Sequence, residues 1–256
     1  MKEMNENYEE NKSLVIEGRN AVLEALRSGK PMDKLYVLDG CQDGPIRTIV
    51  REAKKHDVIL QFVTRERLNQ LSETGKHQGV IAYAAAYTYA SIDDMLQKAK
   101  DAGEDPFLIF LDNVEDPHNL GAIIRTANLA GAHGVVIPKR RAVGLTATVA
   151  KASAGAINYT PVAKVTNLSQ TIETLKQEGM WFVCADMGGS TMYDLNLTGP
   201  IGLVMGNEGS GVSDLVKKHC DFVASIPMKG DIDSLNVSVA TGVLTYEIVR
   251  QRLLKK

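Results

Sequence analysis

Apolar segments that alternate with helical patterns dominate the second half of the chain, and they constrain its fold most strongly. Segments 107–112 (FLIFLD), 134–138 (GVVIP), 181–186 (WFVCAD) and 201–206 (IGLVMG) are apolar almost throughout. A strand that is apolar on both faces needs cover on both faces, as in a parallel sheet flanked by helices. The sequence therefore predicts an α/β fold with a mostly parallel sheet.

Helical patterns separate these strands, and a smaller α/β pattern precedes them. In the second half we expect helices over 121–131, 147–157, 168–178, 211–220 and 238–254, and a strand within 222–228. In the first half we expect helices within 17–30, 46–56 and 65–72 and strands at 34–39, 58–63 and 79–87.

The chain of 256 residues divides into four parts on composition. Residues 1–12 are polar and acidic and predict a flexible tail. Residues 13–90 form the small α/β domain, and residues 106–256 form the larger one. Between them, residues 91–105 are rich in charge and predict a linker, of which the first part could be helical.

Composition also excludes several classes of protein. The three cysteines, Cys41, Cys184 and Cys220, form no CxxC pair, so we expect neither a zinc ribbon nor a disulfide framework. No apolar run approaches the roughly 20 residues of a membrane helix, and the N-terminus lacks the apolar core of a secretory signal. We expect a cytoplasmic protein without a metal site or a membrane segment.

The net charge of −2 argues, taken alone, against a protein that binds nucleic acid. The excess of acidic residues lies in segments 1–12 and 91–105, however, whereas both predicted domains carry a small excess of Lys and Arg. The sequence therefore allows modest, local basic surfaces that could contact phosphate groups.

Three loops follow the predicted strands, and ligands of open α/β sheets bind at the carboxyl ends of strands. These loops cover 113–125, 206–211 and 226–242. Each has a structural alternative, since Asn119, Glu208, Ser234 and Asn236 could simply cap helices. The glycine pattern of GNEGSG reverses that of a dinucleotide-binding fingerprint, so we do not expect NAD.

Taken together and in this order, the loops resemble a known family. DNVEDPHNLGAIIRTA, LVMGNEGSG and IPMKGDIDSLNVSVATG are similar to the three motifs of the SpoU branch of the SPOUT RNA methyltransferases. The piece from LVIEGRNAVLEAL to IAYAAAY resembles the substrate-binding domain of one subfamily. That subfamily includes bacterial 23S ribosomal RNA guanosine-2'-O-methyltransferases.

The resemblance implies a fold, a cofactor and partners. The fold would be a C-terminal domain with a trefoil knot, preceded by a small domain like ribosomal protein L30e. The cofactor would be S-adenosylmethionine, and the protein would be a homodimer that acts on ribosomal RNA. Transfer RNA as substrate, or a relative that binds RNA or the ribosome without catalysis, are the alternatives.

The resemblance also implies roles for particular residues. The cofactor would be held at Gly206, Ile226 and Leu235, with Met205, Asn207, Met228 and Val237 beside them. The catalytic set would comprise Arg125, Asn119, Glu208, Ser234 and Asn236. RNA contacts are expected at His118, Lys139, Arg140, Arg141 and Arg19.

The proton acceptor stays open at this point. The guanidinium of Arg125 is protonated at neutral pH, which makes it a poor base. Arg125 could hold a phosphate while another group or water accepts the proton, or an unusual environment could make it the base. His118 is the alternative base, because imidazole titrates near neutral pH.

Overall fold

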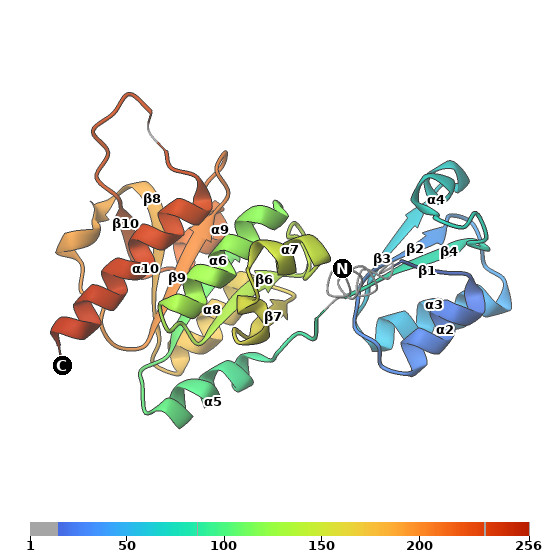
Figure 1. Ribbon diagram of the computed structural model, residues 1–256, viewed down its shortest axis with the longest axis horizontal. Helices are drawn as coiled ribbons and strands as arrows, with labels where there is room; N and C mark the ends of the chain where they lie inside the picture. The colour runs from blue at the N-terminus through green and yellow to red at the C-terminus, as the bar shows by residue number, and fades with distance from the viewer. Residues whose placement is uncertain (1–14, 86, 233, 256) are drawn as a thin grey trace, which may run out of the picture. The chain divides into compact units, whose positions relative to one another are not determined.

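Figure 1 shows the computed structural model, which describes residues 15–85, 87–232 and 234–255. The chain folds into two compact units. The small unit extends to Thr88 and includes residues 144–147, and the large unit comprises residues 89–143 and those from Thr148 onward. The expected tail, residues 1–12, lies outside the described residues.

The small unit is a four-stranded sheet with two helices packed on one face. Its sheet has the order β1-β4-β2-β3, with β2 and β3 parallel and the other pairs antiparallel. Apolar residues from α2 and α3, among them Leu26 and Ile49, are buried against Leu35 and Val37 of β2. Its elements are β1 (Val15–Glu17), α2 (Arg19–Arg27), β2 (Met32–Leu38), α3 (Gly44–Lys55), β3 (Ile59–Val63), α4 (Arg65–Leu71) and β4 (Val80–Ala84).

The large unit is built on a six-stranded sheet of order β10-β8-β9-β5-β6-β7, in which every neighbouring pair is parallel. Its strands are β5 (Phe107–Asp112), β6 (Gly134–Pro138), β7 (Val162–Val165), β8 (Trp181–Thr191), β9 (Ile201–Gly206) and β10 (Phe222–Ser225). Its α-helices are α5 (Ile92–Ala102), α6 (Pro117–Leu129), α7 (Ala147–Ala152), α8 (Leu168–Gln177), α9 (Asp214–His219) and α10 (Val237–Leu254). The prediction of a parallel α/β sheet is confirmed. Within the described part of the chain, no helix is both long and apolar enough to cross a membrane.

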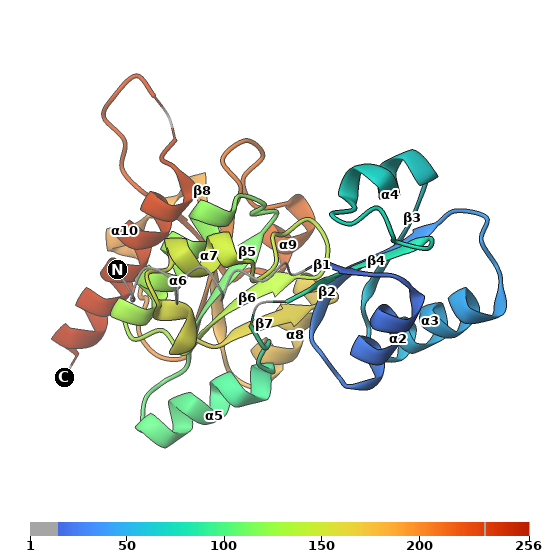
Figure 2. The same ribbon diagram turned by 45° about the vertical axis from the view of Figure 1, so that its right-hand side comes forward.

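Helices cover both faces of this sheet (Figures 1 and 2). On one face, Leu108 and Phe110 of β5 are buried in a core with residues of α5, α8 and α9. On the other face, α6 and α10 pack against each other. Because all six side chains of β5 are buried, this strand lies at the centre of the unit, as its apolar sequence indicates.

The expected helix in the first part of residues 91–105 is confirmed, but the segment belongs to the large unit and is not a linker between the two units. It forms α5, which belongs to the large unit and begins with a reciprocal hydrogen-bonded cap between Ser91 and Asp94. Met95 and Ala99 are fully buried, and Met95 packs so closely on Gly134 that a Cβ there would lie 2.3 Å from its sulfur. Most of the charged residues that led to the prediction, those from Asp93 to Asp101, occupy the solvent face of this amphipathic helix.

Other boundaries differ from the expectation for local reasons. The expected helix over 147–157 ends at Ala152, because Ala154 and Gly155 adopt positive φ angles of 48° and 85° before a short 3-10 turn. Helix α6 begins at Pro117 rather than at residue 121, with the Asp116 side chain accepting a hydrogen bond from the Asn119 backbone. Strands β1 and β7 were not predicted, since runs of three and four residues give little periodicity.

Gly121 allows α6 to approach the α7 region closely, and replacing it is expected to destabilise the large unit. A Cβ at this position would lie 2.4 Å from the Ala152 Cβ and 2.8 Å from the Val149 carbonyl oxygen. We expect Gly121→Ala to lower the free energy of unfolding by about 1–3 kcal/mol, measured by chemical denaturation. Gly44→Ala, where a Cβ meets no atom within 4 Å, is the control. Equal stability of both variants would contradict the close approach.

Candidate functional site

A cavity of about 250 Å³ lies at the carboxyl ends of β9 and β10, beside the middle of β8. Its wall contains all seven residues that the resemblance to the SpoU motifs predicts for cofactor binding. They come from the ends of two separate loops. They are Met205, Gly206, Asn207, Ile226, Met228, Leu235 and Val237. Glu208 and Ser234, from the expected catalytic set, line the same cavity.

The loop after β9 is closed by hydrogen bonds to Asn207. The Asn207 side-chain oxygen accepts from the backbone N–H groups of Gly209 (3.0 Å) and Ser210 (2.7 Å), and its carbonyl accepts from the Gly211 N–H. Asn207 and Gly211 thereby form an isolated bridge. A Cβ on Gly206 would lie 2.0 Å from the Gly211 carbonyl carbon, so only glycine fits where the loop folds back on the strand.

Glu208 is the centre of a polar cluster between the second and third loops and the start of α6. Its carboxylate accepts hydrogen bonds from the side-chain amides of Asn119 (3.3 Å) and Asn236, and from the Val237 backbone N–H (3.3 Å). Asn236 also donates to the Asn119 side-chain oxygen at 3.0 Å. These residues are far apart in sequence, and the fold brings them together.

The helix-cap alternative is also confirmed for Asn236, which belongs to the polar cluster and caps α10. Its side-chain oxygen accepts hydrogen bonds from the backbone N–H groups of Ser238 (3.0 Å) and Val239 (3.3 Å) at the start of α10. Its amide nitrogen remains free to donate to Glu208. A single side chain therefore caps the helix and orients the cluster.

A second cavity of about 550 Å³ adjoins the first and shares Glu208, Val237 and the loop from Asn207 to Ser210. It is lined on the other side by residues 113–116 and by Asn119, from the loop between β5 and α6. Arg141, which has a positive φ of 57°, also lines it. Of the expected RNA contacts, Arg141 is therefore the one that the structure places at the candidate site.

Arg125 and His118 lie on α6 with exposed side chains. His118 occupies the second position of the helix and Arg125 a position two turns further on. Neither belongs to the described lining of the two cavities. The structure therefore does not bring Arg125 into contact with Glu208 within one chain.

The remaining basic residues have different surroundings. Arg140 is exposed, whereas Lys139 is half-buried. Burial lowers the pKa of Lys139, and the nearby charge of Lys164 lowers it further. Arg19, on the small unit, forms a 2.6 Å ion pair with Asp43 and donates to the Gln78 carbonyl. Arg19 thus fixes local structure, and its guanidinium is largely engaged within the unit.

Sequence reasoning missed the contribution of β8 to the cavity. Ala185, Asp186 and Met187 line it, and Asp186 pairs with Lys217 of α9 at 2.7 Å. The hydrogen bond from Lys217 holds the pKa of Asp186 below its ordinary value, and the carboxylate raises the pKa of Lys217. The available signal was Asp186 at the end of an apolar strand, where ligands of α/β sheets bind.

Comparison with known families agrees with this geometry. Residues 106–246 match the SpoU rRNA Methylase family, and residues 15–90 match the family described as RNA 2'-O ribose methyltransferase substrate binding. The first match covers more than half of the chain and includes all three loops of the site. The chain therefore belongs to the SpoU rRNA methylase family and is an RNA methyltransferase of the ribose 2'-O class.

Individual relatives narrow this assignment to the TrmH-type members. The chain is 49% identical over 237 residues to YacO of Bacillus subtilis, which is described as a TrmH-family tRNA/rRNA methyltransferase, with 92% of this chain and 94% of that protein covered. The solved structure of the SpoU methyltransferase AviRb from Streptomyces viridochromogenes with AdoMet is 25% identical, with a TM-score of 0.59 and 94% and 90% of the two chains covered. A TrmH/SpoU tRNA-modifying enzyme from A. aeolicus is 29% identical, with a TM-score of 0.54. The match covers only 63% of this chain and 85% of the A. aeolicus chain.

Proposed function

We propose that the first cavity holds S-adenosylmethionine and that the protein transfers its methyl group to a ribose 2'-hydroxyl of RNA. Bound S-adenosylmethionine supplies a methyl group activated by the positive charge of its sulfonium. The residues present fit this molecule, because Ile226, Leu235 and Val237 offer apolar walls for a purine ring. The glycine loop at 206–211 lets backbone groups approach its polar edges closely. This juxtaposition of loops carries the proposal.

The polar cluster at Glu208 would orient the accepting ribose. Asn119 and Asn236 fix the carboxylate at the boundary of the two cavities, so that RNA entering the larger cavity meets it there. Arg125 does not belong to the described lining of either cavity within one chain, so its role requires the homodimer proposed below. There the partner subunit's Arg125 would hold the phosphate next to the target ribose and stabilise the developing alkoxide, since a guanidinium stays protonated. The proton itself would pass to water or to a neighbouring group.

Ribosomal RNA, and within it a guanosine of 23S RNA, is the substrate that we propose. The small unit supports this choice, since the tRNA-modifying structure from A. aeolicus leaves more than a third of this chain uncovered. The test is transfer of tritium from labelled S-adenosylmethionine to unmodified ribosomal RNA and to unmodified transfer RNA, followed by mapping of ribose methylation. Labelled ribosomal RNA with one modified guanosine is expected. Label on transfer RNA alone would overturn the substrate, and label on neither would support a binder without activity.

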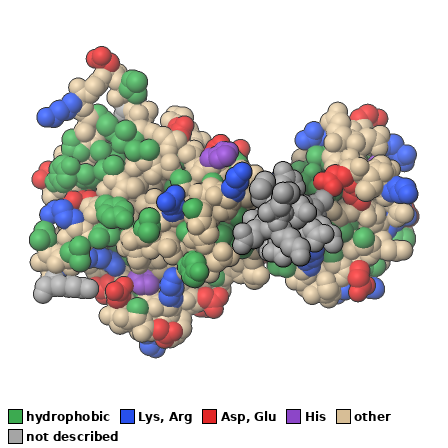
Figure 3. Space-filling model, viewed as in Figure 1, with side chains coloured by type: hydrophobic (Ala, Val, Ile, Leu, Met, Phe, Trp, Pro, Cys, Tyr) green, Lys and Arg blue, Asp and Glu red, His purple; other side chains and the backbone are tan. Residues whose placement is uncertain are grey.

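We further propose that the large unit contains a trefoil knot and forms a homodimer through α10. Exposed apolar side chains gather over α10 and the segments beside it (Figure 3). Val239, Tyr246 and Leu253 repeat every seven residues along α10 and are each at least half exposed, which makes a continuous stripe. Gly242 lies within this stripe, and no atom is within 4 Å of the position its Cβ would take, so a partner helix could approach closely.

The stripe makes a direct prediction about assembly. Tyr246→Asp places a charge at its centre and should convert a dimer to a monomer, measured by light scattering after size-exclusion chromatography. Leu215→Asp is the matched control, since Leu215 on α9 is similarly exposed but lies outside the stripe. A dimer that persists in Tyr246→Asp, or a wild-type monomer, would contradict this interface.

A further inference from the structure

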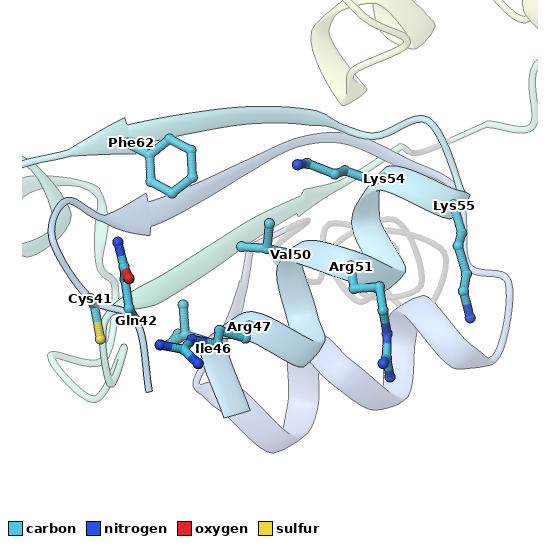
Figure 4. Close-up of a pocket in the computed structure, with 9 residues that line it drawn as sticks. All are labelled: Cys41, Gln42, Ile46, Arg47, Val50, Arg51, Lys54, Lys55 and Phe62. Carbon is cyan, nitrogen blue, oxygen red and sulfur yellow. The ribbon is translucent and has the colours of Figure 1, made fainter. Parts of the chain in front are cut away.

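A groove of about 640 Å³ on the small unit has no assigned role. It lies between α3 and β3, which is the edge strand of the sheet (Figure 4). Val50 and Ile46 of α3 contribute its apolar surface, and Phe62 of β3 stands at its side with 54% of its surface exposed. A large apolar ring left open on an edge strand, beside a concave surface, indicates a place for a partner.

The charged side chains that line the groove are all basic. They are Arg47, Arg51, Lys54 and Lys55, all from α3. Glu52 neutralises part of this charge, since it pairs with Lys55 at 3.0 Å and lies 3.7 Å from Arg51. Arg47 and Lys54 form no ion pair within the described residues, and so they are the cations available to an anionic ligand.

The basic side chains of the groove point in different directions. In Figure 4 the Lys54 side chain extends along the groove toward Phe62, whereas Arg51 and Lys55 point away from the strand. The groove thus combines an open aromatic face with a cation directed at the same space. Unpaired nucleotides bind in this way, with a base stacked on the ring and its phosphates held by Lys or Arg.

We infer that this groove binds an unpaired stretch of the RNA substrate, with a base stacked on Phe62 and the flanking phosphates at Lys54 and Arg47. The inference rests on the proposed function, because it assumes RNA as the substrate. A duplex does not satisfy the site, since its bases are stacked inside the helix. The groove would therefore select a loop or bulge, at a place distinct from the cavities that the reaction uses.

A tryptophan reporter tests the stacking directly in the full-length protein. Trp181 is the one tryptophan of the sequence, so Phe62→Trp in a Trp181→Phe background places a single fluorophore in the groove. An unstructured oligoribonucleotide of about ten nucleotides should quench its fluorescence, and a blunt duplex of the same length should not. Absence of quenching by the single strand, or equal quenching by the duplex, would overturn the inference.

Kinetics test whether the groove serves the reaction. Phe62→Ala should raise the KM for unmodified ribosomal RNA about tenfold, as expected from the loss of one stacked base, with kcat at saturating RNA and affinity for S-adenosylmethionine unchanged. Phe62→Tyr should restore the wild-type KM. Lys54→Ala should raise KM and reduce its dependence on salt, whereas Lys30→Ala, an exposed lysine outside the groove, should do neither.

The outcomes separate this inference from the proposed function. If the wild-type protein methylates RNA and Phe62→Ala keeps its KM, the groove inference fails alone. If the wild-type protein methylates no RNA, the proposed function fails, and the tryptophan reporter still decides whether the groove binds single strands. If Phe62→Ala loses binding to ribosomal particles but binds naked RNA as the wild type does, the occupant of the groove is a protein, and the inference is overturned.

Discussion

Gly206→Ala is expected to weaken binding of S-adenosylmethionine about 100-fold. The added methyl group would lie within about 2.2 Å of the Gly211 carbonyl group and the Val212 nitrogen, which are backbone atoms. The loop from Asn207 to Gly211 would have to move away from β9, and that loop lines the cavity. Overpacking of this kind costs a few kcal/mol, and about 2.8 kcal/mol corresponds to 100-fold in affinity. Isothermal titration calorimetry measures the effect.

Gly230→Ala is the matched control for this prediction. Gly230 lies in the loop after Met228, has no positive φ, and a Cβ there would meet no atom within 4 Å. We expect its affinity for the cofactor to stay within about twofold of the wild type, because exposed substitutions away from special features change little. Equal affinity of both variants would show that the loop does not hold the cofactor.

Arg125→Ala is expected to abolish detectable methyl transfer, with a loss of at least about 100-fold in kcat, while the affinity for S-adenosylmethionine persists. The side chain is exposed, makes no described hydrogen bond, and lies on a helix that alanine favours, so the fold should be unaffected. Transfer of tritium to unmodified RNA measures the first effect, and calorimetry with the cofactor measures the second.

Two further variants sharpen the test of Arg125. Lys100→Ala removes an exposed charge at the end of α5 and should retain wild-type turnover. Arg125→Lys keeps a cation but loses the planar donor pair, so partial activity is expected if the residue holds a phosphate. Wild-type turnover by Arg125→Ala would remove Arg125 from the catalytic set and direct attention to His118.

The parallel sheet of the large unit could be predicted because its strands are apolar on both faces. These strands alternate along the chain with segments of helical periodicity. The cofactor residues could be chosen only through the resemblance, since each loop alone looks like a helix cap. The polar cluster shows why: Asn119, Glu208 and Asn236 are separated by 89 and 28 residues, and only the folded sheet brings them together. The residues adjacent to each of these three in the sequence do not predict this contact.

Two features lay beyond prediction for physical reasons. Asp186 ends the apolar run that predicts β8, but only the folded sheet brings it beside the loops after β9 and β10 that line the same cavity. Arg19 pairs with Asp43, a partner that its position in the sequence does not reveal, and its contact with RNA stays a prediction. A lone basic residue in a substrate-binding domain therefore says little until its neighbours are known.

The packing of α5 also defines where the large unit could be separated as an independent module. A chain cut at Pro106, where the sequence places the catalytic domain, would lose Met95 from the core and leave a void above Gly134. Loss of a buried side chain of this size costs about 2–5 kcal/mol, a large share of the stability of a domain. A transplantable catalytic module must therefore begin no later than Tyr89, and a gene fusion that exchanges the small unit has to join the two coding sequences at or upstream of that residue.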